Sequence, residues 1–220
     1  MEVSRPVLLG AALVLALVVG PWLAVVAARL TDGDAEQPGR ARMALLTAVF
    51  APLLVGAVLF TGLRPATAAY AWAAGAAVVL GAVDLACHRL PDRVTYPAAA
   101  VCAAAFAVDA VVLGTWSALL RALLAAAVAF GVAALAASVS PAGLGFGDVK
   151  LLALIGLVLG WVGWQTLAAG VFLGLLTGAL IAVALLVTGR AGWRTALPFG
   201  PPLLVGAALA LAVHGPLALG

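Results

Sequence analysis

Two aspartates stand at the ends of long apolar runs. Asp84 closes the run AYAWAAGAAVVLGAVD, and Asp148 lies in GLGFGDVK, directly before another apolar run. A carboxylate at the centre of a bilayer costs about 2.5 to 3.5 kcal/mol even on the most lenient scales, so acids in such places suggest a purpose. Two carboxyl groups that face each other can share a proton, because both cannot ionise cheaply at close range. One can then activate a water as general base while the other donates to a carbonyl oxygen, which is the peptide hydrolysis of an aspartyl protease.

The composition places both acids in a membrane protein. Of the 220 residues, 66% are hydrophobic and 9% are charged, and the mean hydropathy is +1.27. A soluble globular domain carries about 25% charged residues, so that class is excluded. We therefore predict an all-α integral membrane protein in which residues 1–220 form a single membrane domain.

The apolar stretches predict a polytopic bundle of about eight transmembrane helices. A transmembrane helix needs about 20 predominantly apolar residues, and the chain offers about eight such stretches. The first has an apolar core of about 22 residues, longer than the 7–15 of a cleavable signal peptide, so we expect a retained helix. The predicted spans are 7–29, 43–62, 66–86, 95–113, 117–138, 149–163, 165–188 and 199–217.

The basic residues predict the orientation of these spans. If the N-terminus lies outside, eight of the eleven basic residues fall in cytoplasmic loops or at their helix ends. The positive-inside rule therefore favours N- and C-termini outside the cytoplasm, with 30–42 as a short cytoplasmic loop. The net charge of +3 needs no nucleic acid to explain it. The eight residues are Arg29, Arg40, Arg42, Arg89, Arg93, Lys150, Arg190 and Arg194, and the other three are Arg5, Arg64 and Arg121.

This topology brings Asp84 and Asp148 to one side of the membrane. Asp84 lies at the cytoplasmic end of the third span and Asp148 at the cytoplasmic start of the sixth, with Asp92 in the short loop after Asp84. Asp109 lies toward the opposite face. A carboxylate in the last turn of a helix meets the negative end of the helix dipole, so the position of Asp84 suggests a function.

The residues around Asp148 suit such a site. Gly145 and Gly147 let the backbone turn tightly and approach a substrate strand closely. Lys150 either biases the carboxylates electrostatically or anchors the helix at the cytoplasmic surface. The two cysteines, Cys87 and Cys102, form neither a CxxC zinc signature nor a disulfide framework. We expect no metal centre and no cofactor, and the role of His88 stays open.

Three motifs occur along the chain in a specific order. Asp84 is followed by LACHR and then by LPD at residues 90–92, GFGD ends at Asp148, and LPFGPPLL occupies residues 197–204. The combination resembles the type IV prepilin peptidase family of GxGD-type membrane aspartyl proteases, over roughly residues 66–210. The resemblance implies that Asp84 and Asp148 are the catalytic pair. The residues that it implies as supporting are Leu90, Pro91, Asp92, Gly145, Gly147 and Lys150.

The resemblance also implies a substrate and a place in the cell. Family members act at the cytoplasmic face of the bacterial plasma membrane on prepilins and pseudopilins, whose basic leader is cut off before an apolar helix. Many members carry paired CxxC motifs after the first helix and also N-methylate the new terminus. The loop 30–42 has no cysteine, so the chain looks like a short form without methyl transfer. The expected partners are the pilin-like substrate and the lipid bilayer, and the oligomeric state stays open.

Two other functions remain open at this point. A proton-coupled transporter could use Asp84 and Asp148 as a relay, and a detectable inverted repeat would favour it. A non-catalytic scaffold of a pilus or secretion machine would need neither acid. The spacing of LPD and GxGD favours the peptidase.

Overall fold

The computed structural model describes residues 5–31, 37–139, 144–190, 192 and 197–218. Gly143, Arg194 and residues 32–36 of the predicted loop lie outside them. Eight helices account for nearly all of this part of the chain, and the predicted all-α architecture is confirmed. They are α1 (Arg5–Thr31), α2 (Arg40–Thr61), α3 (Pro65–Cys87), α4 (Asp92–Leu113), α5 (Trp116–Val139), α6 (Phe146–Val162), α7 (Trp164–Val187) and α8 (Gly200–Ala218).

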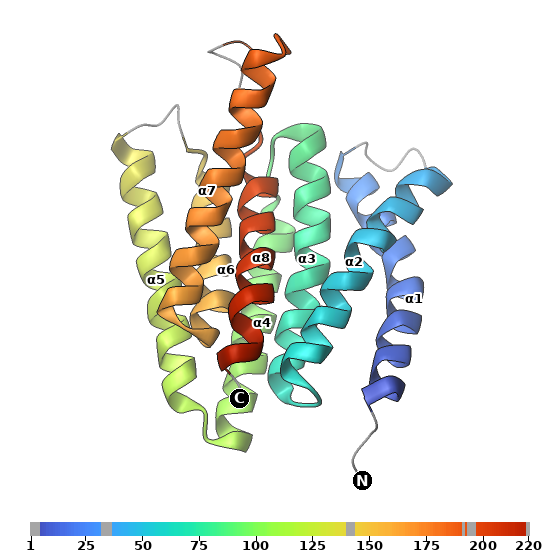
Figure 1. Ribbon diagram of the computed structural model, residues 1–220, viewed down its shortest axis with the longest axis vertical. Coiled ribbons are helices and arrows are strands. Elements are labelled where there is room, and N and C mark those ends of the chain that lie inside the picture. The colour runs from blue at the N-terminus through green and yellow to red at the C-terminus, as the bar shows by residue number, and fades with distance from the viewer. Residues whose placement is uncertain (1–4, 32–36, 140–143, 191, 193–196, 219–220) are drawn as a thin grey trace.

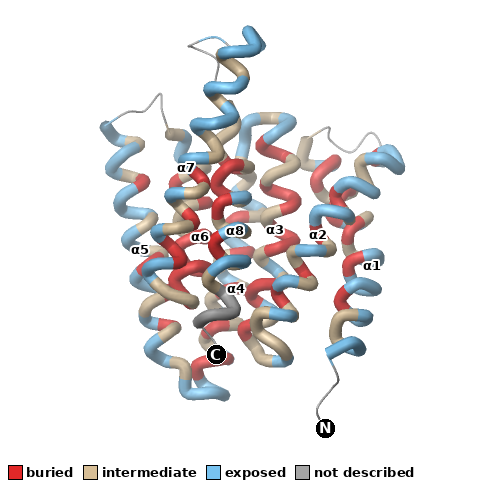
Figure 2. The backbone as a smooth tube through the Cα atoms, in the orientation of Figure 1, coloured by how far each residue is buried: buried red, intermediate tan, exposed pale blue. Residues whose placement is uncertain are grey.

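The helices have the lengths and surfaces of a polytopic membrane protein. Six of them, α1 to α5 and α7, are long and apolar enough to cross a membrane. Helix α6 has 17 residues, which at 1.5 Å per residue is about 25 Å and near the lower limit for a span. Exposed segments dominate the outer helix α5, while buried ones gather toward the middle (Figure 2). Many large apolar side chains point outward, as lipid-facing side chains do.

The bundle consists of two halves that meet along α3, α4, α6 and α8. In the N-terminal half, α1 packs on α2 and α3, and α3 packs on α4. In the C-terminal half, α5 packs on α6 and α7 packs on α8. Helix α8 lies between α3 and α7 (Figure 1). Because α3 contacts α1, α2, α4, α6 and α8, it is the central helix of the fold.

The pairing within the C-terminal half depends on small residues. A Cβ atom at Gly156 of α6 would lie 2.7 Å from the carbonyl oxygen of Ala125 and 2.9 Å from the Cβ of Ala129, both on α5. In the same way, a Cβ at Gly206 of α8 would overlap the backbone of Gly174 in α7. Glycines at such contacts let helix backbones approach closely in lipid. The helix pairs α5–α6 and α7–α8 are therefore tightly packed units.

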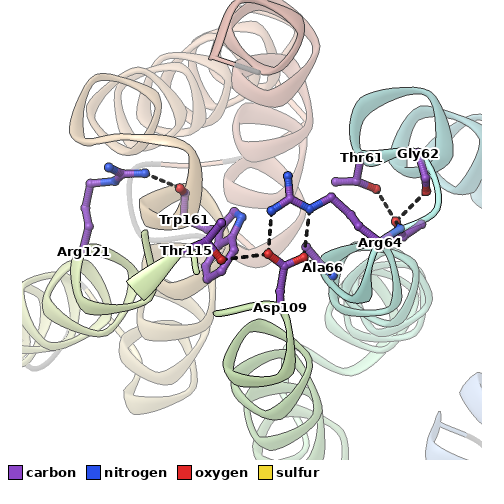
Figure 3. A network of polar contacts seen from close by, with 9 residues as sticks. Thr61, Gly62, Arg64, Ala66, Asp109, Thr115, Arg121 and Trp161 are labelled. Carbon is purple, nitrogen blue, oxygen red and sulfur yellow. Dashed lines mark hydrogen bonds and ion pairs between the residues drawn. The ribbon is translucent and has the colours of Figure 1, made fainter. Parts of the chain in front are cut away.

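A polar clamp closes the end of the bundle at which α3 begins, called the distal end below. Asp109 of α4 is fully buried and accepts hydrogen bonds from Arg64 Nε at 2.8 Å, the Ala66 N–H at 2.9 Å and Thr115 Oγ1 at 2.9 Å (Figure 3). These bonds satisfy a carboxylate that would otherwise be very costly to bury. The hydrogen bonds to Asp109 raise the pKa of Arg64. Asp109, unassigned from the sequence, joins the start of α3 to the end of α4.

A second arginine holds the distal end of the other half. Arg121 of α5 donates from Nε to the carbonyl of Gly160 at 2.8 Å. Its terminal nitrogen donates to the carbonyl of Trp161 (Figure 3). These carbonyls belong to the last turn of α6. The last carbonyl groups of a helix receive no hydrogen bond from within the helix and carry partial negative charge. Arg121 therefore caps α6 and ties it to α5.

We predict that Gly156→Val lowers the melting temperature of the detergent-purified protein. The added isopropyl group would press on the α5 backbone, and overpacking of this kind costs about 1–3 kcal/mol, equivalent to roughly 2–12 °C in a chain of this size. The matched control is Gly131→Val on α5, where an added Cβ would meet nothing within 4 Å. Equal melting temperatures for the two variants would contradict the close-packing account.

Candidate active site

Asp84 is held by the first residue of α8. It lies in the last turn of α3, and only 5% of its surface is exposed. Its Oδ2 accepts a hydrogen bond of 2.9 Å from the N–H of Gly200. The first N–H groups of a helix have no intrahelical partner and carry partial positive charge. A carboxyl group that seemed badly placed at the end of α3 is therefore stabilised by the beginning of α8.

Gly200 is a site residue that the sequence analysis did not single out. A Cβ atom there would lie 2.7 Å from Asp84 Oδ2, closer than a Cβ carbon approaches a non-bonded atom. Any other residue would displace the carboxyl group. The motif LPFGPPLL contained the signal, but nothing local in it points to Asp84.

Asp148 lies in the first turn of α6 and is half-buried. The chain enters α6 through Gly145, which is extended, with φ −69° and ψ 149°, and accepts a hydrogen bond of 3.0 Å from the Asp148 N–H. Gly147, the residue before Asp148, and Gly200, which binds Asp84, both lie against the side chain of Leu90. The structure thus brings the two predicted acids together at one end of the bundle, called the acidic end below.

Leu90 packs between the segments that carry the two acids. Its side chain lies 3.1 Å from where a Cβ at Gly147 would stand, and 3.4 Å from the same position at Gly200. Gly147 directly precedes Asp148, and Gly200 binds Asp84. The leucine of LPD therefore fills the space between the starts of α6 and α8, and glycine at 147 leaves room for it.

Lys150 and Asp92 form an ion pair that joins α6 to α4. Lys150 Nζ lies 2.7 Å from Asp92 Oδ1 and 2.9 Å from Oδ2, and 5.1 Å from the ring centres of both Tyr96 and Phe146. The expectation that Asp92 lies in a loop was wrong, because it is the first residue of α4. An acid is favourable there, since a first helical turn attracts negative charge.

The turn between α3 and α4 is tight. His88 ends α3 with a left-handed backbone at φ 51°, and Pro91 is extended and precedes the first residue of α4. Four residues, 88–91, therefore reverse the chain and set Leu90 beside Asp84. Among the residues that the structure describes, no three His, Cys, Asp or Glu side chains gather as a metal site would require.

The arrangement has the features needed for acid–base chemistry. Two interacting carboxyl groups, each beside the N-terminus of a helix, can hold one proton between them. The ionised member can take a proton from water while the protonated member donates to a carbonyl oxygen. Gly145, directly before α6, is exposed, so a substrate strand can approach its backbone.

Comparison with known proteins identifies the family. Residues 68–186 match the type IV leader peptidase family. A prepilin leader peptidase/N-methyltransferase of Bacillus subtilis (strain 168) is 36% identical over 133 residues, which cover 60% of this chain and 50% of that protein. One of Burkholderia pseudomallei (strain K96243) is 28% identical over 200 residues, which cover 87% of this chain and 61% of that protein.

These matches leave a large part of the relatives uncovered, since the chain spans between half and about three-fifths of their length. No solved structure matches the chain. The family match nevertheless covers more than half of the 220 residues and includes both Asp84 and Asp148. The resemblance inferred from the motifs is confirmed, and the chain belongs to the type IV leader peptidase family.

Proposed function

We propose that this chain is a membrane aspartyl endopeptidase that removes the basic leader peptide from type IV prepilins or pseudopilins. The observation that carries the proposal is the placement of Asp84 and Asp148 at the acidic end of the bundle, where Gly200, which binds Asp84, and Gly147, which precedes Asp148, both lie against Leu90. Family membership supports peptide hydrolysis over proton-coupled transport. The name prepilin leader peptidase, printed for the relatives, supports the choice of substrate.

In the proposed mechanism the two carboxyl groups share one proton before reaction. The ionised carboxylate removes a proton from a water molecule, whose oxygen attacks the carbonyl carbon of the scissile peptide. The protonated carboxyl donates its proton to the carbonyl oxygen, which gives a neutral tetrahedral diol. When the C–N bond breaks, the leaving nitrogen takes up a proton and the diol loses one. The pair again holds a single proton.

The surrounding residues position the acids for this reaction. The Gly200 N–H fixes one oxygen of Asp84, so the carboxyl group has a defined orientation before substrate binds. Leu90 holds the starts of α6 and α8 apart, and the ion pair of Lys150 with Asp92 fixes α6 against α4. Such preorganisation supplies much of the rate enhancement of enzymes.

We place the acidic end at the cytoplasmic face of the bacterial plasma membrane. Most basic residues of the sequence belong to the loops at this end, as the positive-inside rule requires. Two of the three basic residues expected on the other side, Arg64 and Arg121, are bound within the fold. A basic leader also remains on the cytoplasmic side, so its cleavage site reaches the acids there.

We predict that Asp84→Asn and Asp148→Asn each abolish leader cleavage, because the mechanism needs both carboxyl groups. The measurement is co-expression with a prepilin from the same genome, with loss of the leader followed by gel shift. Membrane insertion and melting temperature of each variant verify folding. Full cleavage by either variant at normal expression would exclude the aspartyl mechanism.

Asp92→Asn is the matched control for these variants. It changes an aspartate in the neighbouring motif to the same amide, whose oxygen can still accept a hydrogen bond from Lys150. We expect measurable cleavage, since the ion pair is exposed on the Asp92 side and such pairs contribute about 1 kcal/mol or less. Complete loss with Asp92→Asn would instead assign that carboxyl a part in the reaction.

We predict that Gly200→Ala lowers kcat at least tenfold. The added methyl group would displace the Asp84 carboxyl, and misplacement by about 1 Å can cost about 100-fold. The control is Gly81→Ala, one turn before Asp84 on α3, where an added Cβ would meet only Leu204 Cδ1 at 3.5 Å, an ordinary contact. Parental kcat in Gly200→Ala would show that the Gly200 contact does not orient Asp84.

We predict that the purified protein transfers no methyl group from S-adenosylmethionine to a cleaved pilin N-terminus. The reason is the absence of cysteine from the segment between α1 and α2. The assay follows radiolabelled methyl incorporation, with the Bacillus subtilis relative, named as an N-methyltransferase, as positive control. Methylated product from this chain alone would overturn the prediction.

A further inference from the structure

The two acids belong to different halves of the bundle, so something must fix one half against the other. Asp84 lies on α3 and Asp148 on α6, and these helices contact each other only sparsely. At the acidic end, the hydrogen bonds between the halves run from α8 to α3 and from α6 to α4. Neither joins α3 to α6. The separation of the carboxyl groups therefore depends on how the two helices are held along their length.

A buried tyrosine supplies a direct polar link between these helices. Tyr70 of α3 is 4% exposed, and its hydroxyl donates a hydrogen bond of 3.1 Å to the carbonyl of Val158 in α6. Tyr70 precedes Asp84 by about four helical turns, and Val158 follows Asp148 by about three. In this apolar interior, a hydroxyl that loses its hydrogen-bond partner finds no water to replace it, so breaking the bond is unfavourable. Sliding α3 along α6 would break the bond.

Aromatic rings hold the phenol in place. Phe60 meets the Tyr70 ring edge-on with centroids 5.1 Å apart, and Phe106 does so at 5.7 Å. Phe106 in turn stacks on Trp161 of α6 at 4.3 Å. Because the ring of Tyr70 is contacted on two sides, the position of its hydroxyl oxygen relative to the Val158 carbonyl is fixed. The same cluster links α2, α3, α4 and α6.

We propose that Tyr70 is a positioning residue that sets the axial register of α3 against α6, and thereby the separation of Asp84 and Asp148. A shift of α3 along its axis carries Asp84 with it, whereas Asp148 stays with α6. The hydroxyl lies about 20 Å from Asp84 along α3, too far to touch a substrate bound at the acids. Its effect on catalysis rests on the function proposed above, but its effect on helix register does not.

The test of register is a distance measurement between the ends of α3 and α6. Spin labels are placed at Leu85→Cys and Phe146→Cys, both at exposed positions, in a Cys87→Ser background that leaves the buried Cys102 in place. Tyr70→Phe removes one oxygen and keeps the ring. We expect the distance distribution to shift or broaden by about 1 Å or more, the displacement that impairs catalysis. A distribution identical to that of the labelled parent would overturn the proposal.

The matched control removes a neighbouring contact within one half. Cys102 Sγ of α4 donates to the carbonyl of Ala69 in α3 at 3.3 Å, one residue before Tyr70. Cys102→Ala therefore deletes a buried link to the same turn of α3 without touching α6. In the labelled background, Cys102→Ala should leave the distance unchanged. An equal shift in both variants would mean that any local loosening suffices, and would contradict a specific role for Tyr70.

Activity gives a second and separable readout. With a cleaving parent, Tyr70→Phe should lower kcat at least tenfold with KM within about twofold, because substrate contacts are intact and only the acids are displaced. Incorporation of 4-aminophenylalanine at position 70, which restores a donor, should recover kcat. Parental kcat in Tyr70→Phe would overturn the proposal while leaving the peptidase function intact. If the parent fails to cleave, the peptidase function fails, and the spin-label distances still decide the register.

Discussion

Two carboxyl groups held near each other at the end of an apolar bundle impose the constraint on which the rest of this structure depends. Two unit charges 4 Å apart repel by about 4 kcal/mol at an effective dielectric constant of 20, and burial removes the water that would offset this. Asp84 and Asp148 meet the problem by standing at the N-termini of α8 and α6. In the proposed mechanism, a proton shared between them removes the remaining repulsion. The same conditions make the pair chemically useful.

The bundle has to hold this pair across the contact between its two halves. Specific contacts join the helices within each half. Arg64 and Asp109 join α3 to α4 at the distal end. In the other half, the hydrogen bonds of Arg121 and the close contact at Gly156 hold α6 on α5. Between the halves, hydrogen bonds from Gly200, Lys150 and Tyr70 connect helices that otherwise meet through apolar contacts. The site is therefore assembled by tertiary contacts between rigid parts, which suits a reaction that needs two acids at a fixed separation.

Much of the architecture could be predicted from the sequence, because long apolar runs indicate membrane-spanning helices. The eight predicted spans lie within a few residues of the eight observed helices. Asp84 and Asp148 came together as expected, because their depth and side follow from helix order alone. The start of α4 is less predictable: the sequence analysis places Asp92 in a loop, although an acid is favourable in a first helical turn.

The hydrogen-bond and ion-pair partners of the charged residues could not be predicted from the sequence. The contact of Gly200 with Asp84 joins residues 116 positions apart, that of Lys150 with Asp92 joins residues 58 apart, and that of Arg64 with Asp109 joins residues 45 apart. No local pattern encodes such pairs. Asp84 shows the consequence. The dipole of its own helix α3 disfavours a carboxylate at that position, and only the structure shows that the start of α8 stabilises it.

The central claim is that Asp84 and Asp148 act as one coupled pair, and infrared difference spectroscopy tests it most directly. The carboxyl bands of the purified protein are followed through a pH titration, in the parent and in the two Asn variants. Coupled acids titrate as a pair, so the account predicts that Asp84→Asn changes the titration of the Asp148 band, and that Asp148→Asn changes that of Asp84. Bands that titrate identically with and without the other carboxyl group would show two independent acids and contradict the account.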